Sequence, residues 1–292
     1  AQLREKRKHK TMPIPFTKMH GLGNDYLYIN TEISPVEDPA ALSRAMSHRH
    51  LGAGADGIIL VMPGDNNPFR MRIFTADGSE AETCGNGIRC FAKYVYERNM
   101  TPEKEFVIET LAGPNRVQLS VEDGKVLSVR SNMGSPRFDR AEIPMTGASG
   151  KVLEEPIRLA DGREFRVTCA NIGNPHAVFF VDDATAVDLT DLGPLVENHP
   201  SFPARTNVEF VTVLDRNNIV MRIWERGSGI TMASGSGSCG AALASMITGR
   251  VDRKVQVHLV HGALEIHWSE EDNCVYQQGP ATEVYEGIWP LP

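Results

Sequence analysis

The segment CGNGIRC at residues 84–90 returns 150 positions later as SGSGSCG at residues 234–240. Each copy opens on a small nucleophilic side chain, a Cys in the first and a Ser in the second, and continues as Gly-x-Gly. Two other short segments are repeated at the same spacing of 150 residues. They are Gly23-Asn24 with Gly173-Asn174, and Met71-Arg-Ile-Phe74 with Met221-Arg-Ile-Trp224. Because the repeated residues are mostly small and polar, the repeat indicates two half-domains that face each other and share a site.

Apolar residues recur at helical spacing after each Gly-x-Gly turn, which predicts helices over 88–98 and 239–248. Helices are also expected over 39–48 and, as its weaker repeat, over 189–198. Strand-like runs cover 26–30, 57–62, 71–74, 106–109, 116–121, 177–181, 208–213, 219–224, 255–259 and 264–268. The sequence therefore predicts an α/β (α+β) fold of two pseudo-symmetric lobes. We expect each lobe to be a mostly antiparallel or mixed sheet around a central helix, with the site in the cleft between them.

The stretch 132–150, rich in Gly, Pro and Ser, is the best candidate for a linker. We therefore expect an N-terminal lobe of residues 13–131 completed by 278–292, and a C-terminal lobe of residues 132–277. Residues 1–12 carry several basic side chains without an apolar pattern, and we expect them to form a disordered basic arm.

Composition excludes several classes of function. The chain of 292 residues is 41% hydrophobic and 23% charged, the balance of a globular protein with room for two domains. Its net charge of −7 argues against a nucleic-acid partner, and no apolar run approaches the roughly 20 residues that a membrane helix needs. Five cysteines without a Cys-x-x-Cys pair are typical of free thiols in a reducing compartment, so we expect a cytoplasmic protein.

A Gly-x-Gly turn at the start of a helix lets the backbone come close to a ligand. It points free N–H groups and the positive end of the helix dipole at one spot, which suits a carboxylate or phosphate. A cysteine at that spot is expected to have a lowered pKa. Two such turns facing each other offer an anion pocket between two protic side chains. These are the parts of a two-base racemisation next to a carboxylate.

Other interpretations of these residues fit less well. Residues 235–240 match the dinucleotide fingerprint Gly-x-Gly-x-x-Gly, but no strand–helix alternation surrounds them. A serine-hydrolase elbow needs Gly two residues before the nucleophile, where Met232 stands. The nine histidines show no metal-ligand spacing, so no metal is expected. A lone Cys84 is more often a buried hydrophobe, although its polar, Gly-rich surroundings favour a site. His176 is equally consistent with a turn histidine without a role.

Together these motifs resemble the diaminopimelate epimerase family over about residues 16–287. The segments are Met19-His-Gly-Leu-Gly-Asn24-Asp, Ala76-Asp-Gly-Ser79, Cys84-Gly-Asn-Gly-x-Arg-Cys90, Gly173-Asn-Pro-His176, Pro203-Ala-Arg-Thr-Asn207, and Trp224-Glu-Arg-Gly-Ser-Gly229 followed by Ala-Ser234-Gly-Ser-Gly237. The resemblance implies a two-lobed enzyme that uses neither a cofactor such as pyridoxal phosphate nor a metal. The implied reaction interconverts LL- and meso-diaminopimelate, an amino-acid substrate on the lysine and peptidoglycan pathway. The family often forms homodimers.

Carried over by position, the resemblance implies that Cys84 is one catalytic acid–base and that Ser234 stands at the place of the second. His176 and Glu225 lie where the family tunes the pKa of its thiols. The residues implied to bind substrate are Gly85, Asn86, Gly235 and Ser236 at the reacting carboxylate, Asn207, Glu225 and Arg226 at the distal amino-carboxylate, and Asn24, Thr75 and Asn174.

Two positions depart from the family's pattern. Ser234 replaces the second catalytic cysteine, and Cys239 lies beyond one helical turn from it and cannot substitute. Thr75 stands where the family usually has Asn. Because a hydroxyl is a much weaker acid than a thiol, the sequence predicts an epimerase that is impaired or altered. Two alternatives stay open: a racemase or isomerase of the same fold acting on another amino acid, and a non-catalytic relative that binds an amino acid.

Overall fold

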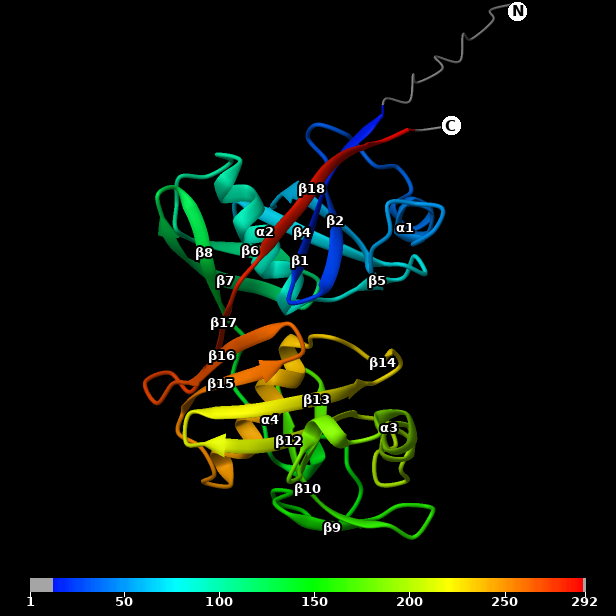
Figure 1. Ribbon diagram of the computed structural model, residues 1–292. Helices are drawn as coiled ribbons and strands as arrows, with labels where there is room; N and C mark the ends of the chain where they lie inside the picture. The colour runs from blue at the N-terminus through cyan, green and yellow to red at the C-terminus, as the bar shows by residue number, and fades with distance from the viewer. Residues whose placement is uncertain (1–12, 291–292) are drawn as a thin grey trace, which may run out of the picture.

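The computed structural model describes residues 13–290, so the arm expected over residues 1–12 lies outside the described part of the chain. Figure 1 shows two halves, each with strands gathered around one helix, α2 (Gly85–Glu97) in the first and α4 (Gly235–Ile247) in the second. The fold is thus the mixed α+β arrangement expected from the sequence, with few helices and extensive sheet.

The order of elements in the first half is repeated in the second. The first half holds β1 (Ile14–Gly21), β2 (Asn24–Asn30), α1 (Pro39–Ser47), β3 (Gly57–Pro63), β4 (Phe69–Thr75), β5 (Glu80–Ala81), α2, β6 (Glu105–Thr110), β7 (Gly113–Glu122) and β8 (Lys125–Asn132). The second holds β10 (Glu164–Asn171), β11 (Pro175–Phe180), α3 (Leu189–Glu197), β12 (Asn207–Asp215), β13 (Asn218–Glu225), β14 (Gly229–Ile230), α4, β15 (Lys254–Leu259), β16 (Gly262–Trp268) and β17 (Val275–Gly279). The 3-10 turns η1 (Arg140–Glu142) and η2 (Ala184–Ala186) and the strands β9 (Glu155–Arg158) and β18 (Thr282–Trp289) complete the described chain.

All four expected helices are present, but α2 and α4 begin three or four residues earlier than the apolar spacing predicted. The Gly-x-Gly segments are their first turns, because the side chains of Cys84 and Ser234 act as N-caps. An N-cap side chain that accepts a backbone N–H can start a helix over residues that have little helix propensity of their own. Glycines that the sequence analysis treated as a turn before the helix are therefore helical.

The strands form one mixed sheet that runs through both halves. Most neighbours are antiparallel. The parallel pairs lie in matching places of the two halves, β2 with β3 and β4 with β6 in the first, and β11 with β12 and β13 with β15 in the second. The halves are joined where β8 pairs with β17, with Ser131 opposite Gln277. After β17 the chain crosses back, and β18 pairs along β1 (Figure 1). This path supports our proposal that residues 278–292 complete an N-terminal lobe of residues 13–131 and that 132–277 form the other.

The stretch 132–150, expected as a linker, is anchored to the second half. Arg137 bridges to Asn171, and the side chains of Phe138 and Ile143 are buried in hydrophobic clusters with residues of that half. Its Gly and Ser residues predicted a loose connection. The buried side chains of Phe138 and Ile143 instead fix the stretch to the second half. The connection is therefore part of the packed structure.

Nearly every residue of α4 is buried, and most of its residues are Ala, Gly or Ser. These small side chains let the surrounding strands approach closely. At Gly240 an added methyl group would lie 2.5 Å from Cγ of His176 on β11. The Gly at this position therefore sets how close α4 can come to a residue of the expected site.

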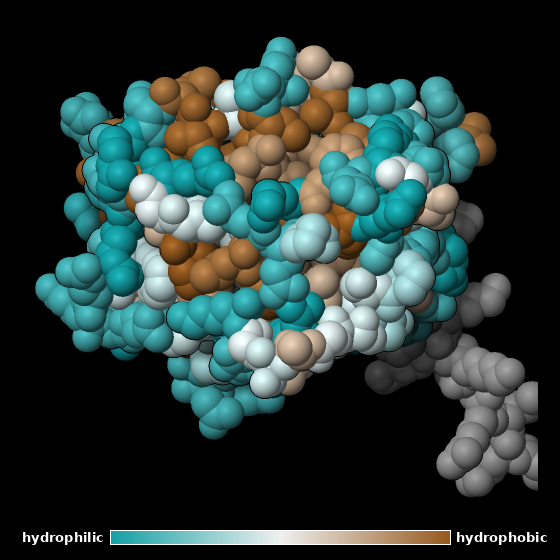
Figure 2. Space-filling model, turned by 90° about the horizontal axis from the view of Figure 1, so that it is seen from below, coloured by the Kyte–Doolittle hydropathy of each residue, from teal (hydrophilic) through white to brown (hydrophobic). Residues whose placement is uncertain are grey.

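The surface of the described residues is mostly polar. Figure 2 looks at the end of the molecule formed by the second half, where hydrophilic side chains predominate and hydrophobic ones gather in separate patches. Within residues 13–290, the structure contains no helix with the length and apolar character to cross a membrane.

We predict that Gly240→Ala destabilises the protein by roughly 1–3 kcal/mol, because the added methyl group overpacks a dense core and must displace His176. Denaturant unfolding monitored by circular dichroism measures this change. Ser245→Ala on the same helix is the control, since its hydroxyl bonds only to the Ala241 carbonyl. Equal stability of Gly240→Ala and the unaltered chain would contradict the close packing.

Candidate active site

The first turns of α2 and α4 lie against each other at the junction of the two halves. Cys84 Sγ accepts the backbone N–H of Gly87 at 3.3 Å, and Ser234 Oγ accepts that of Gly237 at 3.1 Å. A methyl group on Gly85 would lie only 3.8 Å from the Cα of Gly235. The two Gly-x-Gly turns that the repeat singled out therefore meet, and their remaining N–H groups and helix dipoles converge.

On the first side of this junction, Cys84 is surrounded by amides and a phenol. Its thiol donates to Asn24 Oδ1 at 3.3 Å, and Asn86 Nδ2 donates to the same oxygen at 3.2 Å. Asn86 also reaches across to the carbonyl of Ala233 at 3.2 Å, next to Ser234. The Tyr26 hydroxyl is also near enough to Cys84 to act on the pKa of its thiol.

Burial raises the pKa of the Cys84 thiol above its ordinary value. The Gly87 N–H, the Tyr26 hydroxyl and the charge of Arg89 act in the opposite direction but do not outweigh it. The expectation of a lowered pKa from the helix N-terminus alone is therefore wrong for the protein in this form. Loss of water around the sulfur disfavours the thiolate more than the helix dipole favours it.

On the second side, Ser234 is buried and has a carboxylate beside it. Glu225, at the end of β13, accepts the hydroxyl of Thr231 and lies near Ser234. Burial raises the pKa of Glu225, and the hydroxyls of Thr231 and Ser234 act in the opposite direction without outweighing it. A serine can take part in proton transfer only with an adjacent base, and Glu225 occupies that position.

A buried chain of polar groups continues from this side. His176 Nδ1 contacts Glu209 Oε1 at 2.6 Å, and His176 Nε2 contacts Asn174 Oδ1 at 2.9 Å. Asn174 Nδ2 then donates to Ser236 Oγ at 3.2 Å. Glu209 was missed by the sequence analysis, although a single carboxylate within the apolar strand β12 is a usable signal. His176 is thus a buried, hydrogen-bonded residue next to the α4 turn and not a solvent-exposed turn histidine.

Three residues expected to bind substrate lie at strand ends with contacts of their own. Asn207 is buried; its Nδ2 donates to the Pro175 carbonyl at 2.9 Å, and its Oδ1 accepts the Arg226 backbone N–H at 2.9 Å. The Arg226 guanidinium donates to the Ala204 carbonyl at 3.2 Å. Thr75, 150 positions before Glu225, donates its hydroxyl to Asp77. Asn207 therefore positions the Arg226 backbone, and its role in reading a substrate stays a prediction.

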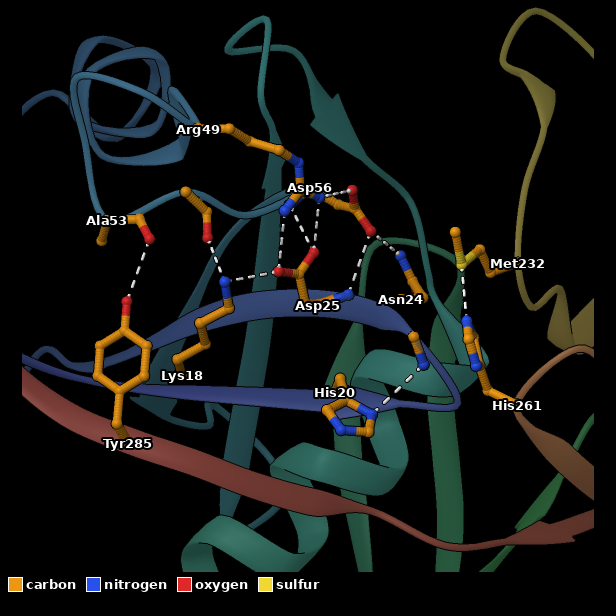
Figure 3. Close-up of polar contacts among 12 residues, drawn as sticks. Lys18, His20, Asn24, Asp25, Arg49, Ala53, Asp56, Met232, His261 and Tyr285 are labelled. Carbon is orange, nitrogen blue, oxygen red and sulfur yellow. Dashed lines mark hydrogen bonds and ion pairs between the residues drawn. The ribbon is translucent and has the colours of Figure 1, made fainter.

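A network of charged residues that the sequence analysis missed holds the side-chain amide of Asn24 in one orientation (Figure 3). Asp25 Oδ2 is 2.8 Å from Lys18 Nζ, and Asp25 Oδ1 is 2.9 Å from Arg49 Nη2. Arg49 also pairs with Asp56 Oδ1, and Asp56 Oδ2 accepts Asn24 Nδ2 at 2.8 Å. Because Asp56 holds the amide nitrogen, the amide oxygen of Asn24 faces Cys84. An Asp at the start of each of two apolar strands was the available signal.

Burial disfavours the charge of Asp25, but its hydrogen bonds and charge interactions with Arg49 and Lys18 hold its pKa below the ordinary value. A carboxyl with a lowered pKa in the folded state stabilises the fold above its unfolded-state pKa, and this contribution is lost as the pH falls through the lowered value. We predict that Asp25→Asn lowers the free energy of unfolding by roughly 1–3 kcal/mol at pH 7. The difference should be full above about pH 5 and shrink on acidification.

Urea unfolding across this pH range measures the effect. Asp252→Asn, which removes an exposed partner of Arg216, is the control and should cost less than about 1 kcal/mol. A loss of stability for Asp25→Asn that is independent of pH would contradict the assignment to charge.

Known proteins share this sequence and this fold. A family model described as diaminopimelate epimerase matches residues 16–138 and 168–284. A diaminopimelate epimerase of Moorella thermoacetica is 54% identical over 278 residues, which cover 94% of this chain and 99% of that protein. One of Methanococcus maripaludis is 46% identical over 272 residues, covering 93% and 98%.

Solved structures with low sequence identity confirm the predicted fold class. A PhzF-family phenazine biosynthesis protein of Bacillus anthracis has a TM-score of 0.66 at 16% identity, covering 96% of this chain and 100% of that one. A hydroxyproline epimerase of Agrobacterium vitis with bound trans-4-OH-L-proline has a TM-score of 0.63 at 16% identity, covering 94% and 90%. These structural matches show only a shared fold, whereas the sequence matches identify a family. The chain belongs to the diaminopimelate epimerase family.

Proposed function

We propose that this protein is an amino-acid epimerase that interconverts LL- and meso-2,6-diaminopimelate without a cofactor, by proton transfer on two faces of one carbon. The observation that carries the proposal is the contact of two helix N-termini, one capped by Cys84 and the other by Ser234, in a chain 54% identical to a diaminopimelate epimerase. We propose that the reaction is impaired or altered by Ser234.

The two first turns supply the binding of the reacting carboxylate in this proposal. Removal of the α proton places negative charge on that carboxylate, and backbone N–H groups at Gly85, Asn86, Gly235 and Ser236 are the donors expected to meet it. Two helix N-termini aimed at one point stabilise such charge more strongly in a site with little water. Asn24 and Asn174, one from each half, contact the same two turns and would orient the substrate beside them.

Cys84 serves one face of the carbon. Its thiol must lose a proton before it can act as a base, and its pKa is raised by burial. Proton removal on this face should therefore speed up with rising pH. A substrate amino group carries positive charge, which would favour the thiolate once the substrate is bound.

Ser234 serves the other face through Glu225. A serine hydroxyl does not ionise near neutral pH, so it can pass a proton only if Glu225 accepts or returns one. The basis for this role is that the Ser234 hydroxyl is near enough to Glu225 to act on the pKa of its carboxyl. We infer a relay from substrate to Ser234 to Glu225 that is slower than a thiol acting directly.

The distal amino-carboxylate would be bound by Arg226 with Asn207, Glu225 and Thr75 around it. A guanidinium pairs with a carboxylate in two-pronged geometry. Asn207 supports this indirectly, since it holds the Arg226 backbone. Thr75, in place of the family's usual Asn, is the residue most able to change which amino acid is accepted.

We further infer a cytoplasmic homodimer of the lysine pathway that needs neither pyridoxal phosphate nor a metal. The five cysteines are free in the structure, which suits a reducing compartment. The homodimer and the absence of a cofactor rest on the family resemblance. Small amino acids, and not nucleic acids or membranes, are the expected partners.

A second candidate function is supported by Ser234 and Thr75 together. A chain altered at both positions fits a racemase of another amino acid, or a protein that binds an amino acid without turnover. Exchange of the α hydrogen with solvent separates these cases from the first. A diaminopimelate epimerase exchanges that substrate, a racemase of different specificity exchanges another amino acid, and a binder exchanges none.

We predict that β-fluoro-diaminopimelate releases fluoride rapidly from one stereoisomer and poorly from the other, because elimination needs only a base and Cys84 is the stronger one. Ser234→Cys should then raise epimerisation, followed by circular dichroism, by roughly 10²–10⁴-fold, the range of a positioned acid–base group. Ser245→Cys on the same helix is the control, because the Ser245 side chain bonds to the Ala241 carbonyl and lies far from the first turn.

Equal fluoride release from both isomers would mean that Ser234 is fully competent. No gain from Ser234→Cys, with the thiol variant folded, would remove Ser234 from the site.

We predict that Glu225→Gln lowers exchange on the Ser234 face by roughly 10²-fold or more at saturating substrate. Exchange on the Cys84 face at saturating substrate should fall much less, although KM should rise on both faces because Glu225 is also placed at the distal group. Burial raises the pKa of Glu225, so exchange on the Ser234 face of the unaltered chain should be lost as the pH falls through a value above the ordinary 4.5. Deuterium incorporation into each stereoisomer measures both faces. Glu155→Gln, which loses a partner of Arg140 elsewhere, is the control. Parallel loss on both faces would show a structural role instead.

A further inference from the structure

Arg89 is the largest fully buried side chain of the described structure, and it lies directly behind the junction of the two helices. Its hydrogen bonds go to the backbone carbonyls of Gly85 and Pro280 and to the side-chain amides of Asn86 and Gln277, and no ion pair among residues 13–290 includes it. A buried charge without a countercharge destabilises a fold. Burial lowers the pKa of Arg89, yet an arginine remains charged in proteins. The buried positive charge of Arg89 therefore costs folding free energy, and the fold itself gives no reason to keep it.

The contacts of Arg89 connect the two helix starts. Its Nη2 donates to Asn86 Oδ1 at 2.7 Å, and its Nη1 donates to Gln277 Oε1 at 2.5 Å. Gln277 in turn donates from Nε2 to the Gly235 carbonyl at 2.8 Å. The guanidinium thus joins the first turn of α2 to that of α4 through one side chain on each side.

This bridge also fixes which way two amides point. Because the Asn86 oxygen accepts from Arg89, its nitrogen must face Asn24 Oδ1 and the Ala233 carbonyl. In the same way, the Gln277 oxygen faces Arg89 and its nitrogen faces α4. Both amides lie at the turns that carry Cys84 and Ser234.

The space for the guanidinium is provided by glycines. A methyl group on Gly21 would lie 2.9 Å from Nη2 of Arg89, and one on Gly279 would lie 3.4 Å from Nε. The position 150 residues later in the repeat is Cys239, so one cation serves both halves. Adding this cation to two helix N-termini concentrates positive potential at one point, which favours an anion there and disfavours the empty site.

We propose that Arg89 is a positioning residue that aligns the two helix starts through Asn86 and Gln277, and that its charge is the fixed countercharge for the anions of the site. Those anions are the Cys84 thiolate and, if the proposed function holds, the substrate carboxylate as it gains charge. The inference about the thiolate can be tested without any turnover.

The charged and titratable groups around this pair come from several elements. Facing Cys84 are Tyr26 of β2, Arg89 of its own helix and Glu225 of β13; facing Arg89 are Cys84, Cys90, Tyr28 of β2 and Cys239 of α4. Burial raises the pKa of Cys90 and of Cys239 to about 12. Arg89 is thus the only cation of this set, and removing its charge should act mainly on Cys84.

The test is the pH dependence of iodoacetamide alkylation at Cys84, followed peptide by peptide by mass spectrometry so that each cysteine is resolved. Arg89→Gln keeps a polar, hydrogen-bonding side chain without the charge, and it should raise the midpoint for Cys84 by about one pH unit. Arg89→Lys keeps the charge and should restore most of the shift. Arg98→Met is the control, because Arg98 lies just after α2 and is paired with Glu283 and Glu286.

A midpoint for folded Arg89→Gln equal to that of the unaltered chain would overturn the proposal. If Arg89→Gln does not fold, Gln277→Glu neutralises the guanidinium in place and should raise the midpoint in the same direction; an unchanged midpoint there also overturns it. Neither measurement uses substrate. Both would therefore test the role of Arg89 even in a protein without epimerase activity. A matching loss of α-proton exchange in Arg89→Gln, with partial rescue in Arg89→Lys, would extend the role to the substrate anion.

Discussion

The architecture depends on one unfavourable arrangement, the meeting of two helix N-termini with like partial charges. Each helix end contributes about half a positive charge and several unpaired N–H groups, and the starts of α2 and α4 are in contact. The caps Cys84 and Ser234 each accept one of these N–H groups. Asn86 and Gln277 connect the two helix starts by donating to the carbonyls of Ala233 and Gly235. The N–H groups that remain favour a neighbouring anion, which is the physical basis of the anion pocket proposed above.

The two halves are alike in backbone and different in chemistry. Helices α2 and α4 have the same length and start 150 residues apart, yet the partners around them diverge. Tyr26 stands in the first half where His176 stands in the second, and Arg89 where Cys239 stands. The α4 turn has the buried carboxyl groups of Glu209 and Glu225 near it, whereas the α2 turn has the thiol and the buried cation. The carboxylates of the first half, Asp25 and Asp56, are paired with Lys18 and Arg49. The repeat gives the two halves the same backbone arrangement. The different side chains on this backbone make the two sides of the candidate site chemically different.

The repeat and the Gly-x-Gly turns made the fold class, the four helices and the pairing of the halves predictable from the sequence. Strands such as β10 and β18 were not, because charged residues interrupt their apolar alternation and their pairing with distant strands holds them. The site was predictable where a short motif carries it, as at Cys84 and Asn174. Asp56 and Glu209 left only a carboxyl group beside or within an apolar strand as a signal, and Gln277 left none. Each acts through a contact with a residue more than 30 positions away, which the sequence does not show.

The replacement of a thiol by Ser234 changes less of the site than the loss of an acid–base group suggests. The hydroxyl keeps the N-cap bond to Gly237, so the α4 turn retains the geometry that the Cys84 turn shows in the other half. The Ser234 hydroxyl also lies near Glu225 and acts on the pKa of that carboxyl. In the proposed relay, the titrating proton is carried by Glu225 and not by the cap side chain. The geometry of the turn and the supply of a proton are thus separable features.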